Sequence, residues 1–317
     1  YKINIIRSDS VYKNILKAPI NDRDSIFTKE ILVPFKKKFE VQHMPIYNDD
    51  KQTMSAIQFL DAFQISPKDL RMSDQMSIQY LNNDFWSNCE KYLKVAIDQF
   101  SNYSISSQVS NYHFTVLLGD SQKPLMYLNK NRGGDGGIPG YIMIYLVPST
   151  STINSMKSLI AHEVNHNMRY RYIDWDGGSL IELIIAEGLA ENYVESLYGK
   201  AHIGPWVTNT NWSRDNVKIK NTIYNHLHLK HIFESMPYLY GDDINKLQGR
   251  PIVGLSHAAG YACGYHLVKY FLQKTNIPIE VATTLPAQKI INEVTEFWHT
   301  HTPVSYHHLT LPTTSSL

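Results

Sequence analysis

The sequence has little cysteine, no long apolar run and no excess of charge of one sign. Its two cysteines, Cys89 and Cys263, match no metal or redox spacing in a chain of 317 residues. Two cysteines form no disulfide framework and favour a reducing compartment, so we expect a cytoplasmic protein. The chain begins at Tyr1 rather than methionine, which also fits a processed or truncated N-terminus.

The absences also exclude two classes of partner. No run of roughly 18 apolar residues is present, so no transmembrane span is expected. Lysine and arginine number 30 and aspartate and glutamate 29, which leaves no field favouring nucleic acid or an anionic membrane. Apolar residues make up 43% of the chain, which is ordinary for a globular protein with a real core.

Apolar periodicity and turn residues divide the chain into three regions. Residues 1–110 are polar and amphipathic at helical spacing, with interrupting prolines, and predict a helical N-terminal region. Residues 111–300 combine predicted strands and helices and carry the motifs described below. Residues 301–317 have neither a helical period nor core-forming content, and predict a disordered or artefactual tail.

Within the middle region, strands precede helices. Short β-branched and aromatic runs at residues 113–118 and 141–147 predict strands. Amphipathic segments predict helices over 153–170, 180–198 and 256–272. This order is typical of an α+β fold.

A glycine-rich segment, residues 131–140, separates the two predicted strands. It fits neither the phosphate loop nor the dinucleotide-binding fingerprint, because the required lysine and third glycine are missing. Its composition predicts a flexible hairpin connection, with a mobile rim over a cleft as the alternative.

The predicted helix 153–170 contains a candidate metal-binding pair, in the sequence His-Glu-Val-Asn-His. Because four residues make slightly more than one helical turn, His162 and His166 point the same way, with Glu163 beside them. This is the His-Glu-x-x-His pattern of zinc hydrolases, in which the glutamate is the general base. Two core histidines beside a paired glutamate are the alternative, although an ionised glutamate is costly to bury. The pattern predicts a site for one Zn²⁺ ion.

The next predicted helix offers three glutamates as a third ligand: Glu182, Glu187 and Glu191. Glu187 and Glu191 share a helical face, and Glu182 lies off it. We favour Glu187 as the ligand, because Gly188 beside it would let this helix approach the histidine helix closely. Glu191, one turn further, is placed to accept the outer N–H of a ligand histidine. A solvated pair of surface glutamates is the alternative, but the apolar neighbours predict a buried helix.

These two segments resemble the gluzincin metallopeptidases, whose third zinc ligand is a glutamate that often begins a stretch like Glu-Gly-Leu-Ala at residues 187–190. Together with residues 259–265, Ala-Gly-Tyr-Ala-Cys-Gly-Tyr, they resemble the predicted zinc-dependent protease family catalogued as domain of unknown function 2268. The resemblance covers roughly residues 110–295. It implies a zincin-like α+β domain that acts as a zinc metallopeptidase on a peptide or protein substrate.

The resemblance also implies a role for each residue. Zinc held by His162, His166 and Glu187 would lower the pKa of its water toward ~7. Glu163 would take the proton as that water attacks a carbonyl, and would hand it to the leaving amine.

In related peptidases a tyrosine or histidine from a later segment stabilises the oxyanion. Here Tyr261 is the first candidate and His257 the second, spaced four apart with Tyr265 on one predicted helical face. An aromatic core stripe is the alternative for the two tyrosines. Residues 141–147 could offer backbone groups to an extended peptide.

Two other functions fit the same pattern. A metal-binding regulatory or interaction module would keep the fold without turnover, but a purely structural zinc needs no base at Glu163. A zinc hydrolase of a non-peptide substrate is the second alternative.

Overall fold

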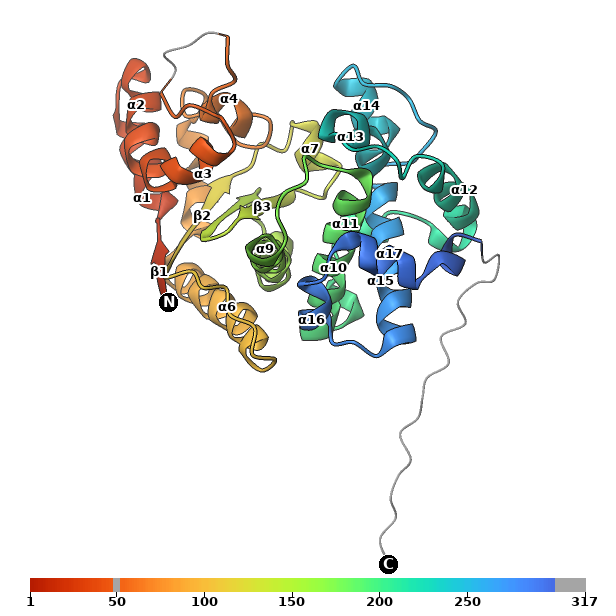
Figure 1. The fold of residues 1–317 in the computed structure, drawn as a ribbon. Coiled ribbons are helices and arrows are strands. Elements are labelled where there is room, and N and C mark those ends of the chain that lie inside the picture. The colour runs from red at the N-terminus through yellow and green to blue at the C-terminus, as the bar shows by residue number, and fades with distance from the viewer. Residues whose placement is uncertain (48–51, 300–317) are drawn as a thin grey trace, which may run out of the picture.

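The computed structural model describes residues 1–47 and 52–299, so the predicted tail at 301–317 lies outside the described residues. One half of the molecule combines a sheet with helices, and the other half, from α10 onward, is helical (Figure 1). The α+β class is therefore confirmed. In the described part of the chain, no helix is both long and apolar enough to cross a membrane.

The sheet has four strands in the order β1-β2-β4-β3. The pairs β1–β2 and β2–β4 are parallel, and β3 pairs with β4 antiparallel. The predicted strands correspond to β2 and β4, which are buried and central because their β-branched and aromatic side chains suit a covered sheet. The strands are β1 (Lys2–Ile5), β2 (Asn111–Leu118), β3 (Arg132–Ile138) and β4 (Tyr141–Leu146).

The expectation of a flexible connection at residues 131–140 is wrong, because most of this segment forms the edge strand β3. A methyl group on Gly136 would overlap the carbonyl oxygen of Glu163, on the helix packed beneath the strand. A methyl group on Gly134 would overlap the Glu163 side chain. The glycines therefore permit close approach of two backbones, and only a tight turn at residues 139–140 connects the strands.

The N-terminal region is mainly helical, as expected, and also contributes β1 to the sheet, which the periodicity did not predict. Because β1 pairs with β2, the predicted division at residue 110 falls between two paired strands, and it stays a prediction. The helices here are α1 (Ser8–Lys17), α2 (Arg23–Phe27), α3 (Lys36–Val41), α4 (Ala56–Leu60), α5 (Gln75–Tyr80) and α6 (Asn83–Ser101), with single turns η1 (Ile20–Asp22), η2 (Thr28–Leu32), η3 (Val33–Phe35) and η4 (Met72–Asp74).

The predicted helix 153–170 is interrupted at Ser155, whose hydroxyl donates to the carbonyl of Thr152. It forms α8 (Thr150–Asn154) and α9 (Met156–Tyr172). The predicted helix 180–198 is confirmed as α10 (Leu180–Tyr198). Ser179 caps its first turn, and Gly199 ends it with a positive φ of 86°.

The third predicted helix begins three residues late, as α15 (Ala259–Thr275), because Ala258 takes a left-handed conformation with φ 57°. His257 is consequently not helical and does not share a helical face with Tyr261, as we expected. The remaining elements are α7 (Pro124–Tyr127), η5 (Lys200–His202), α11 (Pro205–Thr208), α12 (Trp212–Tyr224), α13 (Ile232–Tyr240), α14 (Asp242–Leu247), α16 (Ile279–Thr283), α17 (Ala287–Glu293) and η6 (Thr295–Trp298).

Helix α9 lies between β3 and α10 and is buried over most of its length (Figure 1). Its polar side chains bind the elements on either side. The Asn167 amide donates to the carbonyls of Gly136 (2.6 Å), Ile138 (3.1 Å) and Tyr141 (3.0 Å), and its oxygen accepts from the N–H of Gly140 (2.6 Å). One side chain thus holds the β3–β4 turn against α9.

We expected Gly188 to let α10 approach the histidine helix α9, but the helix that it lets approach is α15. A methyl group there would overlap the carbonyl of Gly264 on α15, and one on Gly264 would overlap the carbonyl of Ile184. The two glycines let α10 cross α15 closely, whereas α10 approaches α9 through the side chains of the candidate metal site.

Candidate metal centre

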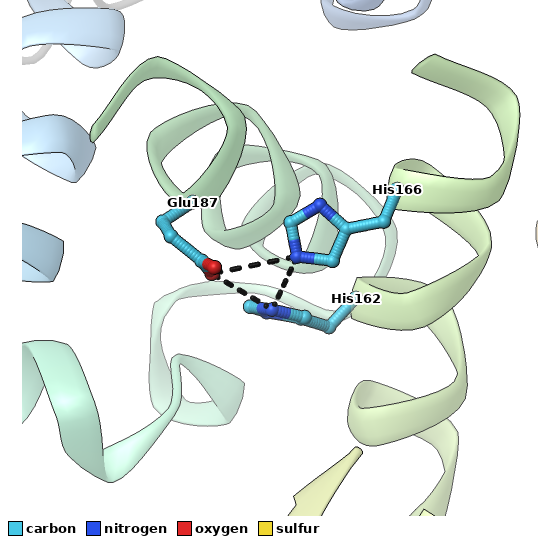
Figure 2. Close-up of side chains that lie close together, drawn as sticks. All are labelled: His162, His166 and Glu187. Carbon is cyan, nitrogen blue, oxygen red and sulfur yellow. Dashed lines mark hydrogen bonds and ion pairs between the residues drawn. The ribbon is translucent and has the colours of Figure 1, made fainter. Parts of the chain in front are cut away.

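Three side chains from two helices converge on one point (Figure 2). His162 and His166 extend from α9 and Glu187 from α10. The Nε2 atoms of the histidines are 3.0 Å apart, and Glu187 Oε2 is 3.1 Å from His162 Nε2 and 3.4 Å from His166 Nε2. The structure therefore brings together the three residues predicted as ligands.

The donor set fits a zinc ion. Four ligands at about 2.0–2.1 Å around a tetrahedral ion are separated by about 3.3 Å, close to the three spacings observed. Glu187 Oε2 is also a buried oxygen with no hydrogen-bond donor. Within residues 1–47 and 52–299, no other three His, Cys, Asp or Glu side chains gather in this way. Two imidazoles and one carboxylate leave a fourth position for water or substrate.

Glu191 lies behind His162 and is almost fully buried, at 1% exposure. Its Oε1 is 2.7 Å from His162 Nδ1, which fixes Nδ1 as the protonated nitrogen and leaves Nε2 free to face Glu187. The indole N–H of Trp206 also donates to Oε1 at 2.7 Å, and the N–H of Gly204 donates to Oε2 at 2.7 Å. This contact matches the position predicted for Glu191. Trp206 and Gly204 belong to no motif, so only the fold places them here.

Glu163 lies beside the three convergent side chains, under the glycines of β3. Burial raises the pKa of its carboxyl to about 7, and the nearby carboxylates Glu187 and Asp135 act in the same direction against the two imidazoles. A carboxyl group with this pKa can both accept and release a proton near neutral pH.

The third glutamate considered as a ligand, Glu182, is engaged elsewhere. Its two oxygens accept from Nε and Nη2 of the fully buried Arg169, at 2.7 and 2.6 Å. Arg169 also donates to the carbonyls of Thr283 and Leu285, at 3.1 and 3.0 Å. This bidentate pair ties α9 to α10 and the segment after α16.

Two tyrosines face the candidate centre. Tyr261 on α15 and Tyr240 at the end of α13 have ring centroids 6.0 Å apart. The Tyr261 ring is 6.5 Å from that of Trp206, which in turn is 5.3 Å from that of His162. Burial raises the pKa of both hydroxyls, and the Glu187 carboxylate raises them further, so both stay protonated and able to donate. Sequence reasoning named Tyr261 and missed Tyr240, which lies in no recognisable motif.

The other two candidates on this segment contact different partners. His257 Nε2 is 2.8 Å from the amide oxygen of Asn129. The Tyr265 hydroxyl donates to Glu195 at 2.7 Å, on the side of α15 that packs on the end of α10.

Comparison with known proteins agrees with this geometry. The family model described as "Predicted Zn-dependent protease (DUF2268)" matches residues 85–292, more than half of the chain. The uncharacterized protein YjfC of Bacillus subtilis (strain 168) is 30% identical over 288 residues, which are 89% of this chain and 94% of that protein. No solved structure matches the chain. The chain belongs to the predicted zinc-dependent protease family.

Proposed function

We propose that the protein is a zinc metallopeptidase of zincin-like fold that hydrolyses peptide bonds. One observation carries this function: His162, His166 and Glu187 converge with spacings that suit zinc, and the buried Glu163 lies immediately beside them. The family assignment supports the same function.

Each residue of the centre has a distinct proposed role. His162, His166 and Glu187 would hold one Zn²⁺ ion, which when bound acidifies a water molecule and polarises a carbonyl. Glu163 accepts the proton of the attacking water and delivers it to the leaving nitrogen. Glu191 orients the ring of His162 through its contact with Nδ1.

The oxyanion formed from the substrate carbonyl needs a hydrogen-bond donor. We assign this role to the hydroxyl pair of Tyr261 and Tyr240, because both stay protonated beside Glu187. The bond of His257 to Asn129 supports the tyrosines over His257 for this role.

An extended peptide can pair its backbone with a free strand edge. The expectation that residues 141–147 supply it is wrong, because β4 pairs on one side with β2 and on the other with β3. Strand β3 is at the end of the sheet and lies over Glu163. We propose that an extended peptide pairs with β3, which brings its backbone to the general base.

The test compares wild type, Glu163→Gln and the exposed-site control Glu293→Gln. Bound zinc is quantified, and cleavage of a mixed peptide library is followed by mass spectrometry. We expect about one zinc in each protein, cleavage by wild type and control, and loss of cleavage in Glu163→Gln, by a factor of at least ~10². Absence of zinc from wild type would exclude the metal site. Turnover that survives in Glu163→Gln would exclude Glu163 as the base.

A further inference from the structure

A row of aromatic rings leads from the candidate metal centre to the surface. The ring of Tyr170 lies 6.4 Å from that of His166 and nearly parallel to it, with an interplanar angle of 24°. Trp175, in the loop between α9 and α10, meets Tyr170 edge-on at 5.8 Å. Trp175 is 51% exposed although it is a large apolar side chain. An apolar surface thus continues from a candidate ligand out to solvent.

Helix α13 provides a second apolar row that ends at the same centre. The ring of Tyr240 at its C-terminal end lies 6.0 Å from that of Tyr261. Tyr261 in turn lies 6.5 Å from Trp206, whose ring is 5.3 Å from that of His162. Phe233 precedes Tyr240 by seven residues, so it lies on the same face about 10 Å away along the helix. Met236 lies between them on this face. Phe233 is 79% exposed, more than any other large apolar side chain in the described chain.

The two rows are joined at their outer ends. The N–H of Ile232 donates to the carbonyl of Gly177 at 3.0 Å. A methyl group on Gly178 would lie 2.5 Å from Cβ of Ile232, so the loop and the start of α13 are in close contact. Trp175 is two residues before Gly177, and Phe233 directly follows Ile232. Two exposed aromatic side chains are thereby held on adjoining backbone segments.

We propose that Trp175 and Phe233 form a subsite for a bulky apolar side chain of the substrate peptide. This inference rests on the proposed peptidase function and adds its substrate class. Exposed aromatic surface is costly to keep in water, and its continuity with the metal centre identifies an extended peptide as the occupant. A peptide bound along the centre would cover both rings with a phenylalanine, leucine or similar side chain.

The test uses quenched fluorescent peptides that differ at one position, with phenylalanine or alanine placed in turn on each side of the cleaved bond. Wild type, Trp175→Ala, Phe233→Ala and the double variant are compared with Met76→Ala, a 75% exposed side chain on α5. We expect wild type to favour phenylalanine at one position. The double variant should lose roughly 10-fold or more in kcat/KM for that peptide, mainly through KM, and keep its rate on the alanine peptide.

A binding measurement makes the result independent of turnover. Glu163→Gln, with and without Trp175→Ala and Phe233→Ala, is titrated with both peptides in a fluorescence-anisotropy assay, after circular dichroism has shown that each variant is folded. Tighter binding of the phenylalanine peptide that disappears with the two substitutions supports the subsite. Equal binding of the two peptides, or an undiminished preference in the double variant, overturns it and leaves the proposed function standing. Loss of zinc or of all cleavage in wild type instead contradicts the proposed function.

Discussion

Among single residues, Glu191 fixes the orientation of the His162 ring, although it is not itself one of the three proposed zinc ligands. Its carboxylate has three partners within 2.7 Å: the His162 ring, the Trp206 indole and the backbone of Gly204. The three contacts hold a buried charge in one orientation, and a charged acceptor makes the His162 nitrogen that faces Glu187 more basic.

Glu191→Gln should weaken zinc binding by about 10- to 100-fold, because a neutral acceptor supports the imidazole less well than a carboxylate. The measurement is competition for zinc against a chromophoric chelator. Glu195→Gln is the matched control, since Glu195 lies one turn further on α10 and bonds to Tyr265 and Lys269 instead. Equal zinc affinity in the two variants would contradict the orienting role of Glu191.

The predictable residues of the centre are those that lie a few positions apart on the same helix. Helical periodicity alone brings His162 and His166 together, and it places Glu187 and Glu191 on one face of the next helix. Tyr240 and Trp206 could not be predicted, because they reach the site from separate elements that only tertiary packing brings near.

Among the elements, β3 and α9 are in unusually close contact. Four glycines in seven residues would ordinarily weaken a strand, since glycine has a large conformational entropy in the unfolded chain. Here Gly134 and Gly136 face α9, where a side chain would overlap Glu163. The close packing on α9 and the pairing with β4 compensate for the weak strand propensity of glycine. Glycine-rich composition predicted a loop here, but tertiary contacts made the segment a strand.

Gly136→Ala should destabilise the protein by about 1–3 kcal/mol, as overpacking of a tight interior does. Gly137→Ala is the control one residue away, because no atom lies within 4 Å of a methyl group placed there. Thermal unfolding followed by circular dichroism compares the two variants with wild type. If Gly136→Ala unfolds at the same temperature as Gly137→Ala, β3 does not need glycine for its approach to α9.

The start of α15 illustrates the limit of sequence periodicity for helix boundaries. Apolar spacing continues back to Ser256, but Ala258 adopts a left-handed conformation that no alanine preference predicts. Its N–H donates to the carbonyl of Tyr240 at 2.7 Å, a contact that ties the loop to the end of α13. A bond between distant segments therefore decides where the helix begins.

For the whole molecule, the ion pair of Lys38 and Asp135 connects the N-terminal helices to the edge strand. The Lys38 side chain is fully buried on α3, and its Nζ is 2.6 Å from the Asp135 carboxylate on β3. Gln42 accepts a further bond from Lys38 at 2.6 Å. Asp135 points away from α9 while its glycine neighbours face it, so β3 is held from both sides.

Lys38→Met should lower the free energy of unfolding by about 3–5 kcal/mol near neutral pH, because it leaves a buried carboxylate unpaired. Burial acts to raise the pKa of Asp135, but the Lys38 ammonium outweighs it and holds that pKa below the ordinary value of 3.8. The ion pair therefore stabilises the fold fully above pH 3.8. This stabilisation is lost as the pH falls through the lowered pKa of Asp135.

The measurement is urea denaturation of wild type and Lys38→Met from about pH 7 down to about pH 3, where the difference between them should shrink. Lys36→Met on the same helix is the control, because Lys36 is exposed and forms a surface pair with Glu40. A difference that is constant across this pH range would show that Lys38 stabilises the fold by packing rather than by charge.

At this scale, the sequence predicts the class of the fold better than its topology. The order of strands and helices indicates α+β correctly. The parallel pairing of β1 with β2 could not be predicted, since more than a hundred residues separate the two strands. No sequence feature of either strand identifies the other as its partner. Long-range pairing depends on how the intervening helices pack.

The amide of Asn167 has a consequence for how the proposed zinc ion would be bound. This side chain and Arg169 secure α9 to the hairpin and to α10 through bonds in which none of His162, His166 and Glu187 takes part. The scaffold can therefore be complete before any metal binds. On the proposed function, a chelator should abolish peptide cleavage without unfolding the protein. The supply of zinc, rather than the rate of folding, would then set the amount of active protein.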